Sequence, residues 1–376
     1  MTDMVKERTK IAFVTPWYGR GIPGGAEAVA YQTSVRLAAR GWAVEVLTTG
    51  IKDFYGDWGK NYHRPGVKVE EGVTVRRFPV EKRDRAAFDE INSCLMQNIP
   101  ISAADEQTFI EQMIRAPQLT AYIQQHRDEY VFLFIPYMFT TTYAGAKIVP
   151  ERTVLIPCIH DEAYARLPIY QEIIPQAHSL IMHSAAEKRL ANALFTAAHE
   201  QPRRVVGVGV ETNYGADGER FRQKYGLGES PFMLYVGRRE AGKNVPLLIE
   251  YFQRYVQQEN RQVKLVLIGP GEVHIPAGMQ TQIIDCGFVS VQDKYDANAA
   301  ATVICQPSIH ESFSISLMEG WLGGAPALVH ADCDVTREHC QASNGGLYFA
   351  NYPEFAATLT YLLTHPQEAA IIGQQG

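Results

Sequence analysis

The sequence lacks any long apolar run. Its longest apolar stretches, such as Tyr130–Phe139, have the length of a strand, well short of the roughly 20 residues that a membrane-spanning helix needs. The first residues, Met1–Lys10, are polar and charged and lack the apolar core of a secretory signal. We therefore expect a cytoplasmic protein without a transmembrane helix, and these features leave room for peripheral contact with the inner membrane face.

Closely spaced cysteines and a large net charge are also missing. The six cysteines show no CxxC spacing, and several lie in apolar, strand-like runs, as reduced core thiols do. A formal net charge of −6 provides no broad positive surface for a nucleic acid. The composition therefore indicates a protein of a reducing compartment with no nucleic-acid partner.

A recognisable metal site is the third absence. Asp332-Cys333-Asp334 is formally a D-x-D sequence, and His330, His339 and Cys340 add nitrogen and sulfur atoms nearby. Their spacing matches no common zinc site. A polar loop after a strand is sufficient to explain these residues, so we predict no bound metal.

What the sequence contains is an alternation of strand-like and helix-like segments that runs twice along the chain. Its 376 residues exceed what one core organises well, so we expect two domains, residues 1–203 and 204–376. The first is expected to have strands at Lys10–Pro16, Ala43–Thr48, Tyr130–Ile135, Thr153–Cys158 and Ser179–Met182 and a helix at Glu27–Arg40. The second is expected to have strands at Pro231–Val236, Val263–Ile268, Ala301–Cys305 and Ala327–His330 and helices at Val245–Tyr255 and Ser314–Leu322. This alternation predicts the α/β class, with two mainly parallel, doubly wound sheets.

Two insertions interrupt the first alternation. Asp53–Gly66 is rich in aromatic, charged and glycine residues. Asp84–Asp128 is expected to be mostly helical, with breaks near Pro100 and Pro117. Insertions at the carboxyl edge of such a sheet commonly shape specificity, so we expect them to contribute to recognition of a substrate.

Three motifs lie where a strand ends and a helix begins, which is where open α/β sheets bind ligands. The most informative has Glu311 in a loop and Glu319 in the following helix, with seven residues between them. The backbone N–H groups of Ser312–Ile315, at the positive end of that helix, suit a pyrophosphate. Taken alone, the segment is more simply a helix capped by Ser312 or Ser314 and carrying a solvated glutamate.

The second motif is Tyr235–Asn244, which places Arg238 and Lys243 after a strand. Fixed cations at such a place stabilise a departing diphosphate more than they stabilise the bound ground state. Without context, a solvated basic loop that includes Arg239 is the simpler interpretation.

The third motif, Gly19–Glu27, contains both a G-x-G-x-x-G sequence and a G-G-A-E sequence. A nicotinamide-binding fold needs an acidic residue at the end of its second strand, where this chain has Leu47-Thr48-Thr49-Gly50. An NAD-dependent oxidoreductase that uses the Gly19–Gly24 loop is therefore a poor match, and it stays an alternative. Glu27, at the helix start, is expected to complement the helix dipole.

Together these motifs resemble the signatures of retaining glycosyltransferases of family 4. The family pattern P-S-x-x-E-G-F-G-x-x-x-x-E-A-x-x-x-G-x-P is matched here by Pro307, Ser308, Glu311, Phe313, Glu319, Gly324 and Pro326. Serine replaces glycine at Ser312 and Ser314, and Gly320 replaces alanine. The resemblance spans about residues 10–373 and implies the GT-B fold, in which two Rossmann-like domains face each other across a deep cleft.

The resemblance also implies roles for individual residues. The catalytic set would be His160, Arg238, Lys243 and Glu311. The donor would contact Gly24, Gly25, Arg238, Lys243, Gly287, Phe288, Val289, Glu311, Ser312, Phe313, Ser314, Ile315 and Glu319. In this assignment Glu311 contacts the donor sugar and Glu319 its ribose, while Phe288 or Val289 flanks the base.

The implied activity is metal-independent transfer of a hexose with retention of configuration. The donor, a substrate and not a cofactor, would be UDP-glucose or another UDP-hexose, with GDP-mannose next. The first domain would bind the acceptor, a saccharide or lipid-linked saccharide used in polysaccharide or glycoconjugate synthesis. A nucleotide-sugar epimerase of the same fold stays an alternative. Family members usually continue into a helix that crosses back to the first domain, so we expect that helix to be missing after Gly376.

Overall fold

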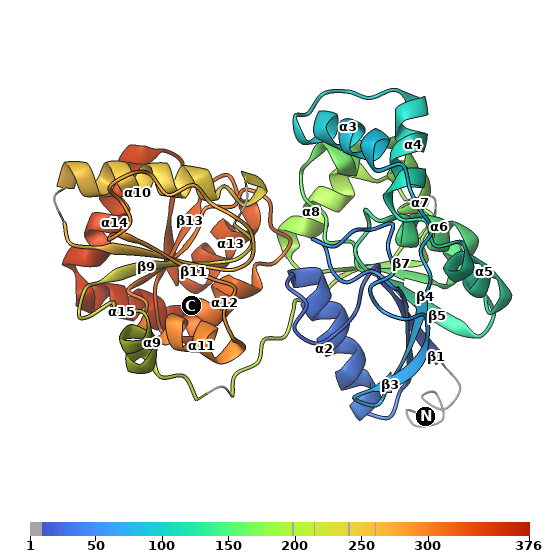
Figure 1. The fold of residues 1–376 in the computed structure, drawn as a ribbon, viewed down its shortest axis with the longest axis horizontal. Coiled ribbons are helices and arrows are strands. Elements are labelled where there is room, and N and C mark those ends of the chain that lie inside the picture. Colours follow the sequence, from blue (N-terminus) through green and yellow to red (C-terminus); the bar gives the residue numbers. More distant parts are fainter. Residues whose placement is uncertain (1–9, 198, 214, 240, 260) are drawn as a thin grey trace. The chain divides into compact units, whose positions relative to one another are not determined.

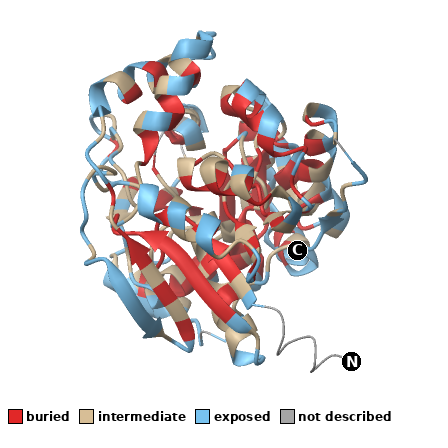
Figure 2. Cartoon of the chain, turned by 90° about the vertical axis from the view of Figure 1, so that its right-hand side faces the viewer, coloured by how far each residue is buried: buried red, intermediate tan, exposed pale blue. Residues whose placement is uncertain are grey.

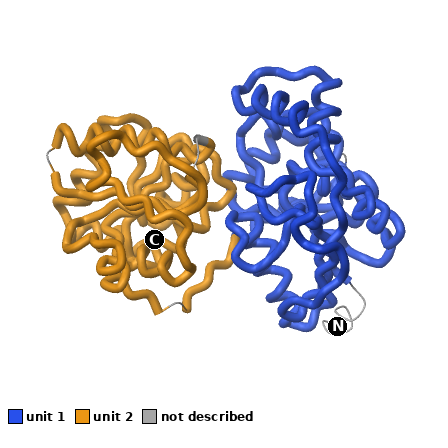
Figure 3. The backbone as a smooth tube through the Cα atoms, in the orientation of Figure 1, with its two compact units in different colours: residues 1–207 blue, residues 208–376 orange. Residues whose placement is uncertain are grey.

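The computed structural model describes residues 10–197, 199–213, 215–239, 241–259 and 261–376. The charged residues 1–9, in which no secretory signal was expected, lie outside these ranges. The chain divides into two compact units, residues 1–207 and 208–376 (Figure 3). The boundary expected from the sequence was 203/204. Each unit has one sheet of its own.

Unit 1 contains an eight-stranded sheet in the order β3-β4-β2-β1-β5-β6-β7-β8 (Figure 1). Its neighbouring strands are parallel, except that β3 and β4 are antiparallel. The strands are β1 Lys10–Val14, β2 Ala43–Thr49, β3 Gly66–Glu70, β4 Val73–Phe78, β5 Tyr130–Phe134, β6 Thr153–Leu155, β7 Ser179–Met182 and β8 Arg203–Val205. The predicted parallel sheet is therefore confirmed, with one antiparallel strand at its edge.

Three strands of unit 1 were not predicted from the sequence: β4, which is mostly buried, and β3 and β8, which are more exposed or polar. Edge strand β3 is exposed along nearly its whole length, and β8 begins with Arg203 and Arg204, so neither shows an apolar run. The expected strand Thr153–Cys158 is too long, because β6 ends at Leu155. Pro157 has no N–H to continue a ladder, and Cys158 turns the chain with a φ of 56°.

The helices of unit 1 fill the connections between its strands. They are α2 Gly25–Ala39, α3 Arg85–Met96, α4 Ala103–Met113, α5 Pro117–Gln125, α6 Thr140–Ile148, α7 Pro168–Ile173 and α8 Ala185–Leu194, with 3-10 turns at Pro150–Arg152 and Ala163–Arg166. The predicted breaks near Pro100 and Pro117 are confirmed. Ser102 and Asp105 form a capping box at the start of α4, and Pro117 is the first residue of α5.

Unit 2 contains a six-stranded parallel sheet in the order β11-β10-β9-β12-β13-β14. Its strands are β9 Phe232–Val236, β10 Lys264–Ile268, β11 Ile283–Gly287, β12 Val303–Gln306, β13 Ala327–His330 and β14 Gly346–Phe349. Its helices are α9 Gly218–Lys224, α10 Val245–Glu259, α11 Val291–Ala300, α12 Ile315–Leu322, α13 Asp334–Ser343, α14 Tyr352–Thr364 and α15 Pro366–Gln375, with a 3-10 turn, η3, at Ala241–Lys243.

Burial follows the layers of each unit, with buried strands and half-exposed outer helices (Figure 2). In unit 2 the two faces of the sheet carry separate apolar clusters. One packs Leu248 and Phe252 of α10 against Phe355 of α14, and the other packs Phe221 of α9 against Ala297 of α11. The predicted α/β class with helices on both faces is therefore confirmed.

The carboxyl ends of β9 and β10 approach each other so closely that one residue there has to be glycine. The N–H of Gly237 donates to the carbonyl of Ile268 at 3.0 Å. Gly269 has a φ of 137°, and a Cβ at this position would overlap the carbonyl oxygen of Gly237. The motif at Gly269-Pro270-Gly271 therefore sets the spacing of the two loops that follow these strands.

We expect Gly269→Ala to destabilise unit 2 by roughly 3–5 kcal/mol, because backbone strain and overpacking add. The matched control is Gly278→Ala. Gly278 also has a positive φ, 81°, but a Cβ there would meet no atom within 4 Å, so the loss should be about 1–2 kcal/mol. Urea unfolding of both variants measures the difference, and equal losses would contradict the predicted collision.

Candidate functional site

The loops that follow β9 and β12 bring two predicted site residues into contact. Lys243, at the end of η3, donates from Nζ to Oε1 of Glu311 at 2.8 Å and to the carbonyl oxygen of His310 at 3.1 Å. Both side chains are largely shielded, with exposed fractions of 17% and 14%. Because β9 and β12 are neighbours in a parallel sheet, their loops meet at the same edge.

Other hydrogen bonds join the same two loops. Asn244, in the left-handed conformation with a φ of 59°, donates from Nδ2 to the carbonyl oxygen of Pro307 at 3.0 Å. Gln306 donates from Nε2 to the carbonyl oxygen of Val236 at 3.2 Å and to Oγ of Ser316 at 2.8 Å. The Lys243–Glu311 pair therefore lies on a backbone that is fixed from both sides.

Glu319 lies in α12 and is nearly buried, with an exposed fraction of 6%. Its Oε1 accepts from Nζ of Lys294 at 2.5 Å and from the hydroxyl of Tyr295 at 3.1 Å. The alternative that Glu319 is a solvated surface residue is therefore wrong. Sequence reasoning missed Lys294, because Val291–Ala300 has no clear helical pattern and was not predicted as a helix.

Ser314 occupies the N-cap position of α12 without a capping side-chain bond. Its φ of 70° and ψ of 74° are left-handed, and its hydroxyl is buried without a hydrogen-bond partner among the described residues. The alternative of a helix capped by Ser312 or Ser314 is therefore wrong. The backbone adopts here the conformation that glycine adopts most readily, which gives a physical reason for the family's glycine at this position. Ser312 and Phe313 precede the helix, and Ile315 is its first residue.

The two neighbouring arginines after β9 have different environments. Arg239 is 7% exposed, and its guanidinium bonds to the carboxylate of Asp285 and the carbonyl oxygen of Gly271. It therefore ties the ends of three strands together, and a solvated basic loop is the wrong interpretation for this residue. Arg238 is half-buried, and its carbonyl oxygen accepts from the hydroxyl of Tyr235 at 2.6 Å. Glu240, in the same motif, lies outside the described residues.

The turn after β11 holds the three residues expected near a base. Gly287 has a φ of 66°, and its N–H donates to Oδ1 of Asp285 at 2.8 Å. The side chain of Phe288 is 65% exposed, whereas Val289 packs against the apolar cluster around α9 and α11. Of the two side chains, the Phe288 ring is therefore the one available for stacking.

In unit 1 the G-G-A-E loop follows β1. Gly24 has a φ of 141°, and the Glu27 carboxylate occupies the place that a Cβ of Gly24 would take. Gly25 begins α2 and has open space around it. Nε1 of the buried Trp17 donates to Oε1 of Glu27 at 2.7 Å, and Trp17 itself packs against Phe54 and other aromatic rings. Glu27 is thus fixed by a specific hydrogen bond in addition to its place at the helix start.

His160 follows β6, and its ring is 24% exposed, with Nδ1 3.5 Å from Oε1 of Glu162. The loop before it is held by Glu187 of α8, which sequence reasoning missed. Glu187 is 1% exposed and accepts from the backbone N–H of Ile159 at 2.9 Å and of His183 at 2.6 Å. Burial raises the pKa of the Glu187 carboxyl to about 7. Glu187 could have been recognised from Ser184-x-x-Glu187, which has the spacing of a capping box at the start of a helix.

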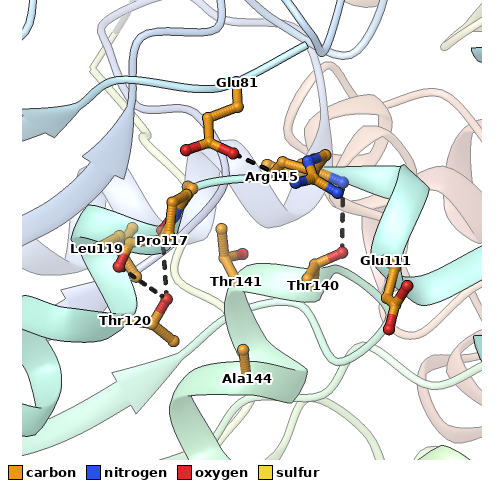
Figure 4. A pocket seen from close by; sticks show the side chains of 11 residues that line it. Glu81, Glu111, Arg115, Pro117, Leu119, Thr120, Thr140, Thr141 and Ala144 are labelled. Atoms are coloured by element: carbon orange, nitrogen blue, oxygen red, sulfur yellow. Dashed lines mark hydrogen bonds and ion pairs between the residues drawn. The ribbon is translucent and has the colours of Figure 1, made fainter. Parts of the chain in front are cut away.

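A pocket of about 210 Å³ lies beside the helical insertion of unit 1 (Figure 4). Glu81 and Arg115, whose side chains are 3.4 Å apart, lie on one side of it, and Thr141 and Ala144 of α6 lie on the other (Figure 4). Glu111 is the third charged residue that lines the pocket. The insertion Asp84–Asp128 therefore shapes a pocket of its own.

The second unit identifies the family. Residues 217–376, which include the motifs of Lys243, Glu311 and Glu319, match the family model described as glycosyl transferases group 1. These residues belong to the group 1 family, also called family 4, and the chain is a glycosyltransferase. The enzyme is accordingly a retaining hexosyltransferase that takes a sugar from a nucleotide sugar. Family membership excludes the NAD-dependent oxidoreductase.

Known proteins resemble this glycosyltransferase over nearly its whole length. The D-inositol 3-phosphate glycosyltransferase of Kribbella flavida is 24% identical over 95% of this chain and 86% of its own. Sucrose-phosphate synthase of Thermosynechococcus elongatus superposes with a TM-score of 0.71 at 16% identity, covering 98% of this chain and 93% of that one. HepE of Anabaena, in complex with UDP and glucose, gives a TM-score of 0.64 at 18% identity, with coverages of 98% and 93%. The predicted GT-B fold, with two Rossmann-like units, is confirmed.

Two features are absent from the described part of the glycosyltransferase: a group of metal-binding side chains and a helix that could span a membrane. No three His, Cys, Asp or Glu side chains among the described residues are grouped so that they could hold a metal ion. Metal independence stays a prediction. In the same ranges of residues, no helix combines the length and the apolar character that crossing a membrane requires.

The pKa of Glu187 predicts a specific pH dependence. Its folded value of about 7 exceeds the ordinary 4.5, so the stabilising contribution of the protonated carboxyl is complete below pH 4.5 and is lost as pH rises to 7. Relative to Glu187→Gln, we expect the wild-type free energy of unfolding to fall by about 1–3 kcal/mol between pH 5 and pH 8.

Urea unfolding of both proteins at several pH values measures this difference. The buried His183, whose pKa is lowered to about 4, titrates in both proteins, so its effect cancels in the comparison. A difference that stays constant or rises with pH would mean that the amides of Ile159 and His183 outweigh burial and keep the carboxylate ionised.

Proposed function

We propose that this glycosyltransferase transfers a hexose from a UDP-hexose, with UDP-glucose favoured over GDP-mannose, to a hydroxyl group of a saccharide or lipid-linked saccharide. The observation that carries the proposal is the contact between Lys243 and Glu311. An ammonium group has three N–H donors, and two of them go to Glu311 and the His310 carbonyl. The third is available to a phosphate oxygen, so one lysine binds the diphosphate and orients the carboxylate that receives the sugar hydroxyls.

The remaining predicted residues take complementary roles in this proposal. Arg238 and the backbone N–H groups of Ser312–Ile315 bind the diphosphate, and Glu319 accepts from the ribose. The exposed ring of Phe288 stacks on the base, and the backbone of Gly287 and Val289 borders it. Of the predicted residues in unit 1, His160 contacts the donor sugar, and Gly24 and Gly25 let the backbone approach the donor.

Leaving-group stabilisation is the main catalytic device that we propose. The bond between the anomeric carbon and the diphosphate oxygen breaks, and the acceptor oxygen bonds to that carbon on the same face. The acceptor proton passes to the departing phosphate. Lys243 and Arg238 balance the negative charge that develops on the diphosphate, which lowers the barrier without a metal ion.

The choice of substrates is supported by the relatives. HepE was solved with UDP and glucose and also with UDP-glucose, and the relative from Kribbella flavida is named for D-inositol 3-phosphate. We assign the acceptor to unit 1, where the pocket at Glu111 and Arg115 is large enough for part of a saccharide. We place the reaction in the cytoplasm, in polysaccharide or glycoconjugate synthesis, with peripheral contact at the inner membrane face when the acceptor is lipid-linked.

The base of the donor can be tested by thermal unfolding with UDP, GDP, ADP and NAD, each with and without EDTA. A ligand at 100 times its dissociation constant stabilises the folded state by about 2.7 kcal/mol. We expect UDP to raise the melting temperature equally with and without EDTA. Stabilisation by GDP alone would move the donor to GDP-mannose, and loss of the UDP effect in EDTA would contradict metal independence.

The Lys243–Glu311 pair can be tested with a double variant. Lys243→Met removes a charged hydrogen bond to the diphosphate, so we expect UDP affinity to fall roughly 10- to 100-fold. Glu311→Gln should reduce turnover of UDP-glucose far more than UDP affinity. Lys243→Met/Glu311→Gln removes both charges and should recover stability but not UDP affinity. The control is Glu229→Gln, on an exposed loop, which should leave UDP affinity unchanged. If Lys243→Met also leaves UDP affinity unchanged, Lys243 does not bind the diphosphate.

A further inference from the structure

Lys294 is a half-buried partner of Glu319 that none of the sequence motifs includes. It lies on α11, and its Nζ is 2.5 Å from Oε1 of Glu319 on α12. The side chain of Lys294 is 25% exposed and that of Glu319 is 8% exposed. The two helices on either side of β12 are thus joined by an ion pair that is largely shielded from water.

The two oxygens of the Glu319 carboxylate have different surroundings. Oε1 accepts from both Lys294 and the hydroxyl of Tyr295, the second at 3.1 Å. Among the residues that the structure describes, Oε2 has no hydrogen-bond donor, and it is not among the polar atoms closed off from water. One oxygen is therefore held by the protein, and the other is left for a ligand.

Lys294 contributes something that Tyr295 does not. A carboxylate with so little exposure is costly unless a cation and hydrogen bonds compensate it. The Tyr295 hydroxyl supplies a hydrogen bond but no charge. The Lys294 ammonium supplies the charge, and its position 4.9 Å from the centroid of the Tyr295 ring restricts its movement.

We infer that Lys294 is a positioning residue for nucleoside recognition, which holds Oε1 of Glu319 so that Oε2 is turned to accept hydrogen bonds from the ribose hydroxyls of the donor. The inference rests on the proposed function, in which Glu319 contacts the ribose. Lys294 acts through Glu319 and does not itself touch the nucleotide. Its removal should therefore affect the ribose hydroxyls selectively and leave the contacts of the base and the diphosphate in place.

The test compares UDP with 2′,3′-dideoxy-UDP by isothermal titration calorimetry. We expect the wild-type protein to bind UDP roughly 10- to 100-fold more tightly, because the hydroxyls bond to a charged acceptor. In Lys294→Met this ratio should fall to about threefold or less, as expected for a neutral or misplaced acceptor. Lys294→Arg keeps the charge and should retain most of the preference for UDP over 2′,3′-dideoxy-UDP. Tyr295→Phe should lower this preference less than Lys294→Met does.

The outcomes separate this inference from the proposed function. If the wild-type protein binds both nucleotides equally, the ribose contact of Glu319 is wrong and the inference falls with it. If UDP is preferred and Lys294→Met preserves the preference, only the inference is overturned. An equal loss of affinity for both nucleotides would overturn it as well, because Lys294 would then bind the diphosphate directly.

A second variant keeps the test valid if Lys294→Met leaves an unpaired charge that prevents folding. Lys294→Met/Glu319→Gln removes both charges and should unfold at a temperature close to that of Glu319→Gln. We expect its ratio of the two affinities to equal that of Glu319→Gln alone, because Lys294 has no effect once the carboxylate is gone. A further drop in the double variant would show an independent contribution of Lys294 and contradict the inference.

Discussion

The ion pair between Lys243 and Glu311 is the interaction on which the candidate site of unit 2 depends. Either charge alone, so largely shielded, would be unfavourable, so the pair holds together the two loops that carry it. Those loops meet because β9 and β12 are parallel neighbours, and the glycines at the end of β10 keep the adjacent loop close. The chemistry of the site thus follows from the direction of the strands as much as from the residues themselves.

The same arrangement, a shielded carboxylate matched by a cation from another element, recurs in unit 2. Asp296, with a fully buried side chain, is paired with Arg220, whereas in the pair of Asp285 with Arg239 it is the cation that is shielded. Glu319 is paired with Lys294. Such pairs fix the orientation of their side chains more than they add to the free energy of unfolding.

The fold could be predicted from the sequence where apolar runs and their connections are regular, as in β1, β7, β9 and β13. It could not be predicted where strands are exposed, as in β3, or polar, as in β8. For the site, Glu311 and Lys243 were recognisable from motif spacing. Arg238 and Arg239 are alike in sequence, and only tertiary contacts make Arg239 structural. Lys294 and Glu187 act through residues from other elements. No local pattern marks Lys294, whereas the capping-box spacing from Ser184 was a local sign of Glu187.

The left-handed Ser314 has a consequence for the way such sites are recognised. Glycine is the residue that adopts this conformation without strain, yet this chain keeps the conformation with a serine, at a cost of about 1–2 kcal/mol. The geometry of the loop before α12 is therefore set by the surrounding fold and is kept with a serine at this position. A pattern search that insists on glycine would pass over enzymes of this kind, whereas a comparison of backbone conformation would find them.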